Sequence, residues 1–188
     1  MRCVSIFPAA MMFLVVAPLH AATTSLTMIS QSGDYIGQGR SYSFTPADGA
    51  FLIYRGYINS SWSNAVYIEF HTPDFGEWWD LVFSAPNNAL LAPGVYEGAV
   101  RAVSAQAVPG LDVYGDGRGC NMLTGRFEIW QIVYTGEGLG GIGAFRATFE
   151  QHCEFATAPS LTGEVWYNAD VPTPALPGSW GALKVLYR

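Results

Sequence analysis

The feature that most constrains this fold is a two-residue alternation of apolar and polar side chains in short segments. One segment places Val66, Ile68 and Phe70 on one side, with polar or charged residues between them. Successive side chains of a strand point to opposite faces, so the segment predicts a half-buried β-strand. The same alternation recurs at 79–83, 96–101, 145–150 and 161–168. No stretch of a dozen residues shows helical spacing, so strands should dominate.

Turn-forming residues separate these segments at close intervals. Clusters rich in proline, glycine or asparagine lie at 46–49, 73–76, 86–88, 93–94, 109–110, 115–119 and 136–143. Glycine adopts the positive φ angles that tight turns need, and proline cannot donate to a central strand. Short strands with such separators, and without intervening helices, predict an all-β fold: an antiparallel β-sandwich or jelly roll.

The first residues have the pattern of a secretory signal peptide. One arginine precedes an apolar run over 6–19, and two alanines follow at 21–22. The alternative is a membrane anchor, but the run is shorter than the ~20 residues that a spanning helix needs. We therefore expect a signal peptide at 1–21, a β-sandwich domain at 22–170, and a proline-rich linker and tail at 171–188. The protein would be secreted, periplasmic or at the cell surface.

Composition narrows the expected partners. The chain has 9 Lys and Arg against 15 Asp and Glu, a formal net charge of −6, and half of its residues are hydrophobic. Nucleic acids and anionic membranes require clustered basic residues, so neither is an expected partner. The mature domain should have no stable membrane span. Carbohydrate or another surface protein remains as an expected partner.

The cysteines predict one disulfide. Cys3 lies within the expected signal peptide, which leaves Cys120 and Cys153 in an oxidising compartment. The alternative is a zinc site, for which His152 is the only nearby further ligand. The segments 124–134 and 143–152 flank a glycine-rich loop and predict a hairpin. That hairpin would bring both cysteines to the same end of the sheet, which supports the disulfide.

Four strings of the sequence are similar to a known family when they are taken together. They are SQSGDYIGQG at 30–39, LAPGVYEGAVR at 91–101, GDGRGCNMLTGRFEI at 115–129 and FEQHCE at 149–154. Their order resembles a recurrent family of uncharacterised secreted bacterial all-β domains, and the likeness covers about Leu26 to Asn168. The resemblance implies export, a single domain and the cysteine pairing. It implies no catalytic residues.

The tail carries a second, shorter resemblance. The string VPTPALPGSWGAL at 171–183 is similar to the beginning of a C-terminal sorting signal of the PEP-CTERM type. A lysine at 184 interrupts the apolar run that should follow, and the run is too short to span a membrane. A truncated sorting signal and an ordinary chain end both remain open.

A short segment that begins at Asp74 is the main candidate for ligand binding. Two adjacent tryptophans stand there beside three carboxylates, and alternation sends the two indoles to opposite faces of a strand. With Trp79 in the core, Trp78 would face outward. An exposed indole can stack on a sugar ring while Asp74, Glu77 and Asp80 accept hydrogen bonds from its hydroxyls. The alternative is an indole partly buried beneath a loop.

A weaker candidate is a calcium loop around Asp112 and Asp116. Glycines surround these two carboxylates, but the loop lacks the third acidic ligand and the closing glutamate of an EF-hand. The alternative is a tight turn in which Arg118 pairs with a neighbouring carboxylate. No other cofactor is expected.

The sequence offers five candidate residues for acid–base catalysis, but they do not form a recognised catalytic motif. They are Glu69, His71, Glu150, His152 and Glu154. No serine lies in a G-x-S-x-G turn, and the paired cysteines are not nucleophiles.

The leading hypothesis is therefore a secreted or cell-surface module without catalytic activity, with a binding or structural role. The alternatives are a carbohydrate-binding domain that uses Trp78 and a hydrolase with an unrecognised site.

Overall fold

The structure is a computed structural model, and it describes residues 22–58, 63–136 and 141–170. The expected signal peptide and the proline-rich tail lie outside these residues. The described strands are β1 Ala22–Ser30, β2 Ser41–Phe44, β3 Ala50–Gly56, β4 Ala65–His71, β5 Trp78–Ser84, β6 Gly94–Arg101, β7 Gly110–Gly115, β8 Leu123–Tyr134, β9 Ile142–Cys153 and β10 Ser160–Asp170. Two single-turn 3-10 helices, η1 Pro86–Asn88 and η2 Ala102–Ser104, complete the described elements. The predicted all-β class is confirmed.

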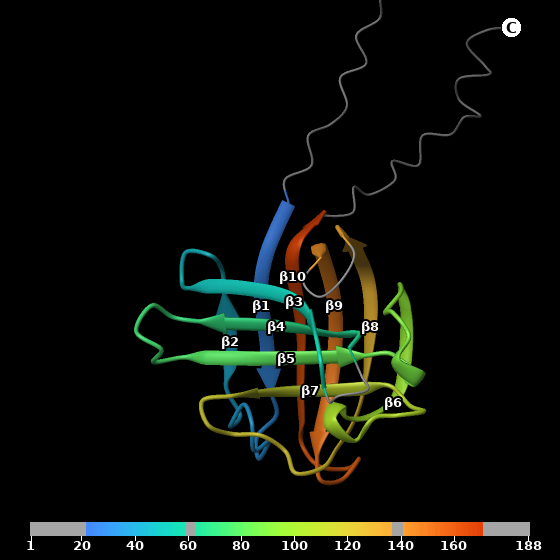
Figure 1. Cartoon of the computed structure of the whole chain (residues 1–188). Helices are drawn as coiled ribbons and strands as arrows, with labels where there is room; N and C mark the ends of the chain where they lie inside the picture. The colour runs from blue at the N-terminus through green and yellow to red at the C-terminus, as the bar shows by residue number, and fades with distance from the viewer. Residues whose placement is uncertain (1–21, 59–62, 137–140, 171–188) are drawn as a thin grey trace, which may run out of the picture.

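All ten strands belong to one sheet, in the order β2-β1-β10-β9-β8-β6-β7-β5-β4-β3. The sheet curls into two layers, so that β3, β4, β5 and β7 run across β1, β10, β9 and β8 (Figure 1). This arrangement is compatible with the predicted sandwich. Within the described residues, no helix is long and apolar enough to cross a membrane.

The sheet is mixed rather than wholly antiparallel, and the exception lies where it passes between layers. β6 pairs antiparallel with β8, and its last two residues pair parallel with β7. The register of β6 against β8 shifts between Tyr96 and Ala99, where Gly98 has a φ of +66°. A bulge of this kind bends a strand, which lets β6 leave one layer and reach the other.

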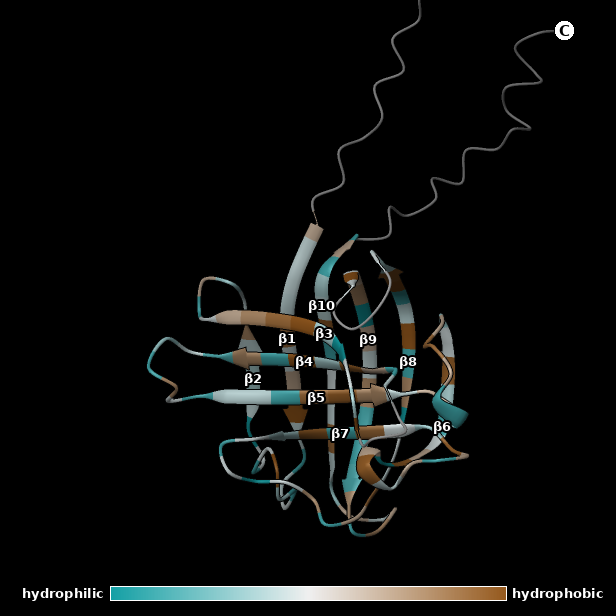
Figure 2. Cartoon of the chain, viewed as in Figure 1, coloured by the Kyte–Doolittle hydropathy of each residue, from teal (hydrophilic) through white to brown (hydrophobic). Residues whose placement is uncertain are grey.

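The core lies between the two layers. Apolar residues recur along β3, β5 and β8, and hydrophilic residues mark the loop from β4 to β5 (Figure 2). Phe83 of β5 is fully buried and contacts Phe127, Phe145 and Phe149 of the other layer, with ring centroids 5.3, 5.5 and 6.4 Å apart. The apolar residues that were predicted to face inward from β4 are also buried, so the predicted inward faces of β4 and β5 are confirmed.

The predicted hairpin and disulfide are both present. β8 and β9 pair antiparallel, with Leu123 opposite Cys153 at the open end of the hairpin. Cys120 and Cys153 form a disulfide with their Cα atoms 5.2 Å apart. Both sulfurs are therefore engaged in the bond, which removes the zinc alternative.

A buried polar bridge joins the layers beside the disulfide. The Gln151 side chain of β9 accepts a hydrogen bond from the Val113 N–H at 2.8 Å and donates one to the Val113 carbonyl at 2.8 Å. Gln151 is only 1 % exposed. Its amide thus satisfies both backbone groups of one β7 residue, as a neighbouring strand would.

Candidate ligand-binding site

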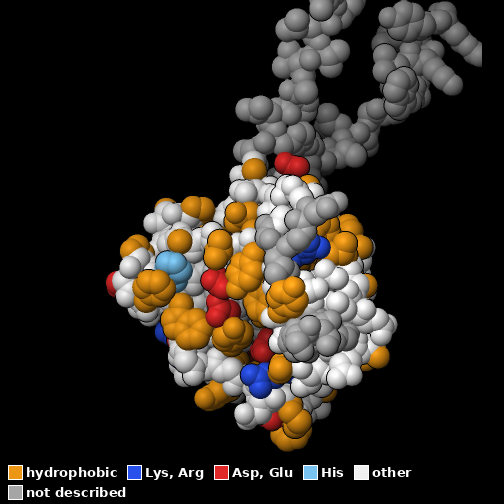
Figure 3. Space-filling view, in the orientation of Figure 1, with side chains coloured by type: hydrophobic (Ala, Val, Ile, Leu, Met, Phe, Trp, Pro, Cys, Tyr) orange, Lys and Arg blue, Asp and Glu red, His pale blue; other side chains and the backbone are white. Residues whose placement is uncertain are grey.

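The outward side chains of β3, β4, β5 and β7 form a grid because these strands pair in register. One row is Tyr54, Tyr67, Val82 and Asp112, and the next is Leu52, Glu69, Asp80 and Tyr114. A third row places His71 beside Trp78. We call the set Tyr54, Tyr67, Glu69, Trp78, Asp80, Asp112 and Tyr114 the aromatic–acidic face. Figure 3 shows acidic side chains with hydrophobic ones gathered around them over these strands.

A hollow of about 590 Å³ opens on the aromatic–acidic face. Tyr67, Trp78 and Tyr114 line it, and the buried residues Val82 and Ala102 contribute apolar surface. The Trp78 and Tyr114 rings meet edge to face, with centroids 6.2 Å apart and planes at 80°. The aromatic walls are thus supported by one another and by a small apolar cluster beneath them.

Asp112 lies against the same hollow and has an unmet acceptor. The residue is 7 % exposed, and its Oδ2 accepts a hydrogen bond from the Arg101 Nε–H at 3.1 Å. Within the described residues, its buried Oδ1 has no hydrogen-bond partner. Burial raises the pKa of Asp112, while the hydrogen bond and charge of Arg101 oppose that shift. A buried acceptor without a partner is costly, so a ligand donor that reached it would be favoured.

Beside the hollow, Glu69 and Asp80 stand directly opposite each other on β4 and β5. The Tyr54 hydroxyl donates a hydrogen bond to Glu69 Oε1 at 2.5 Å, and the Tyr114 hydroxyl forms a hydrogen bond with the Asp80 side chain. Burial and the nearby charge of Glu69 raise the pKa of Asp80, and the hydrogen bond with Tyr114 opposes the shift. Burial, followed by the neighbouring carboxylates, raises the pKa of Tyr54 and of Tyr114.

The structure brings together two of the four predicted ligand-binding residues. Trp78 and Asp80 both point outward from β5, and Trp78 is half-buried rather than fully exposed. Asp74 lies in the loop before β5 and accepts hydrogen bonds from Thr72 Oγ1 and the Gly76 N–H at 2.7 and 3.1 Å. Glu77 has a buried Oε2 without a partner in the described chain. Asp74 therefore stabilises the loop, and Trp78 and Asp80 are the predicted residues that belong to the site.

The proposed calcium loop has other partners for its carboxylates. Asp112 belongs to β7 and pairs with Arg101, as described above. Asp116 Oδ1 accepts a hydrogen bond from the Trp78 N–H at 3.1 Å, and Oδ2 pairs with Arg118 at 3.4 Å. In the part of the chain that the structure describes, no group of three His, Cys, Asp or Glu could hold a metal. These contacts fit the predicted turn, in which Arg118 pairs with a neighbouring carboxylate.

The acid–base candidates are spread over both layers. His71 stacks on Phe75 with centroids 4.2 Å apart, and its Nδ1 lies 3.1 Å from the Thr72 carbonyl oxygen. His152 Nε2 lies 3.2 Å from Glu150 Oε1, next to the disulfide. His71 thus contacts an aromatic ring and a backbone oxygen, not the neighbouring carboxylate pair.

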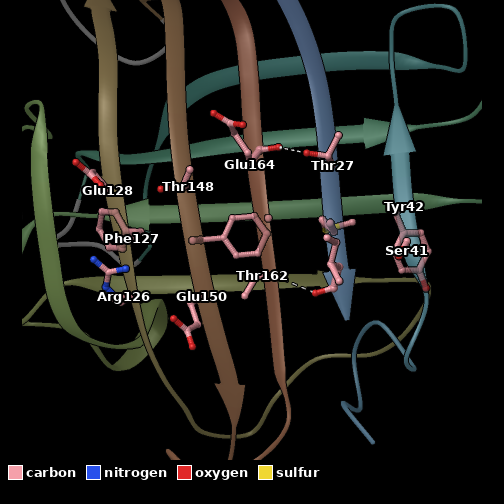
Figure 4. A pocket seen from close by; sticks show the side chains of 14 residues that line it. Thr27, Ser41, Tyr42, Arg126, Phe127, Glu128, Thr148, Glu150, Thr162 and Glu164 are labelled. Atoms are coloured by element: carbon pink, nitrogen blue, oxygen red, sulfur yellow. Dashed lines mark hydrogen bonds between the residues drawn. The ribbon is translucent and has the colours of Figure 1, made fainter. Parts of the chain in front are cut away.

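A second hollow, also of about 590 Å³, lies on the outer face of the other layer. Figure 4 shows Glu128, Thr148, Glu164 and Thr27 in a row across β8, β9, β10 and β1. Sequence reasoning did not single out this surface. The polar residues that alternate with apolar ones were the sequence signal for this surface. Every strand with one solvated face shows the same alternation, so the signal is not specific.

Comparisons with protein-family models, with curated proteins and with solved structures find no match to this chain. The side chains of the site are therefore the basis for a function, since one fold can carry many unrelated activities.

Proposed function

We propose that this chain is an exported, non-catalytic β-sandwich module that binds carbohydrate at the aromatic–acidic face. The observation that carries the proposal is the hollow walled by Tyr67, Trp78 and Tyr114, with the buried Asp112 against it. A sugar ring offers an apolar face that stacks on aromatic side chains and hydroxyl groups that donate to carboxylates. The hollow supplies both partners in one place.

The site is also held in position before a ligand arrives. The Trp78 N–H is fixed by Asp116, and Arg118 Nε donates to the Ile36 carbonyl at 2.8 Å. Arg101 is fixed by Asp112 at the rim of the hollow. Groups that are already ordered lose less conformational freedom on binding, so shallow aromatic surfaces of this kind can still bind usefully.

Binding of the full chain to a glycan array tests the proposal. We expect binding to at least one glycan, and we expect Trp78→Ala to weaken it by about tenfold or more because the stacking wall is removed. Trp130→Ala is the matched control, since Trp130 is an exposed tryptophan on the opposite layer. Absence of binding to every glycan would contradict the proposal. Loss of binding in the Trp130 variant alone would place the site on the opposite layer and also contradict it.

A further inference from the structure

The two carboxylates beside the hollow are held by hydroxyl groups. Tyr54 donates a hydrogen bond to Glu69, and Tyr114 forms one with Asp80. Arg101 and Arg118, which line the hollow, pair instead with Asp112 and Asp116. Hydroxyl donors stabilise a carboxylate without neutralising its charge. Two like charges directly opposite on adjacent strands repel each other, so a cation placed against both would relieve that repulsion.

The surroundings of this pair also favour a cation. Tyr54 and Tyr67 stack with centroids 5.3 Å apart and planes at 4°, next to the Glu69 side chain. Aromatic rings attract cations at their faces, and attraction by charge is stronger where water is partly excluded. Asp80 is half-buried, so the pair is not a fully solvated surface cluster.

An independent observation points to a ligand next to the pair. Asp112 is more than nine-tenths buried, lies against the hollow and has an Oδ1 without a partner among the described residues. Asp112 and Tyr114 both point outward from β7, and Tyr114 stands opposite Asp80. A ring seated in the hollow against Tyr114 would therefore lie beside Asp80 and Glu69.

We infer that the carbohydrate bound at the aromatic–acidic face carries a protonated primary amine, as glucosamine and its polymers do. This inference rests on the proposed function and names the class of its ligand. The ring stacks in the hollow, and the ammonium group lies against Glu69 and Asp80. An ammonium has three donors, which matches two carboxylates that have acceptor capacity left after their tyrosine contacts. An N-acetylated sugar lacks the charge and brings a bulkier, neutral group to the same place.

Calorimetric titration of the full chain with two matched oligosaccharides tests the inference. The probes are the hexamers of glucosamine and of N-acetylglucosamine, at a pH where the amine is protonated and the carboxylates are ionised. We expect the glucosamine hexamer to bind about tenfold more tightly or better, the size expected for a partly desolvated charge pair. Equal or tighter binding of the N-acetylated hexamer would overturn the inference and leave the proposed function standing.

Variants that each remove one negative charge test whether Glu69 and Asp80 cause the preference for the glucosamine hexamer. Asp80→Asn and Glu69→Gln should each bring the affinities for the two hexamers close to parity, while both variants retain the circular dichroism spectrum of the unmodified chain. Glu128→Gln makes the same charge change on the opposite layer and should keep the preference. An equal loss in Glu128→Gln would show general attraction between a polycation and an acidic protein and would overturn the inference. Failure to bind any glycan would instead refute the proposed function.

Discussion

Asp34 is a buried carboxylate that organises the turn between β1 and β2. It is 4 % exposed, its Oδ2 accepts from the Gly37 N–H and from Ser30 Oγ at 2.8 and 2.7 Å, and the neighbouring Ile36 carbonyl accepts from Arg118. Arg118 lies far along the chain from this turn, just after β7. The turn and the segment after β7 thus contact each other, and these contacts maintain the fold.

Gly37 tests how tightly this turn is packed. A Cβ on Gly37 would lie 2.4 Å from Ser30 Cβ and 3.0 Å from Leu161 Cδ1. We expect Gly37→Ala to lower the free energy of unfolding by about 1–3 kcal/mol through overpacking, measured by denaturant titration. Gly136→Ala is the control, because a Cβ there meets no atom of the described residues within 4 Å. Equal effects of the two substitutions would show that the turn can accommodate the added methyl group without overpacking.

Asp80 should make stability depend on pH. Its pKa is raised above 3.8 in the folded state by burial and by Glu69, with the Tyr114 hydrogen bond opposing, so the folded chain binds its proton more tightly than the unfolded chain does. Its stabilising contribution is complete below pH 3.8 and is lost as pH rises through the raised pKa. We expect Asp80→Asn to raise the melting temperature at neutral pH, with a gain that shrinks as pH falls towards 3.8. A gain that is the same at every pH would contradict this assignment.

Alternation within one strand was enough to predict which way Trp78 and Asp80 point. It could not reveal that Glu69, Tyr67 and Tyr114 stand beside them, because these contacts depend on which strands are neighbours. Sequence reasoning therefore identified the centre of the candidate site and missed most of its walls.

Among the elements, β7 was the hardest to predict from sequence. Its inward residues Leu111 and Val113 alternate with the outward Asp112 and Tyr114, yet the acid and the glycines at both ends are typical of a loop. β7 pairs on one side with β6, which precedes it in the sequence, and on the other side with β5, which is more distant in the sequence. The β8–β9 hairpin was predictable because its two strands are long, alternate clearly and flank one glycine-rich loop.

The disulfide should contribute strongly to the hairpin end of the sheet. It joins residues 33 apart in the sequence, and closing a loop of that length lowers the entropy of the unfolded chain. We expect the double substitution Cys120→Ser with Cys153→Ser to cost about 3–4 kcal/mol of unfolding free energy, measured by denaturant titration. Adding reductant should bring the unmodified chain to a similar midpoint and leave the variant unchanged. A variant as stable as the oxidised chain would show that the closed loop contributes little.

At the scale of the whole molecule, the two layers have different outer faces and a common core. One outer face carries the aromatic–acidic face, and the other carries the polar row across β8, β9, β10 and β1 (Figure 4). Ala22 at the start of β1 pairs with Asp170 at the end of β10, so both ends of the described domain lie together (Figure 1). Curling a single sheet thus separates two possible contact surfaces while a single core supports both.

Because the layers share that core, they should unfold together. Phe83 is 0 % exposed and packs on three phenylalanines of the opposite layer. We expect Phe83→Ala to cost about 3–5 kcal/mol and to shift the unfolding curves from far-ultraviolet circular dichroism and tryptophan fluorescence by the same amount. Phe75→Ala is the control, since Phe75 is 64 % exposed and stacks only on His71 among the described aromatic side chains, so its loss should cost much less. Curves that separate in the Phe83 variant would mean that one layer holds its structure alone, and the crossing layers would then be two units joined by a strand.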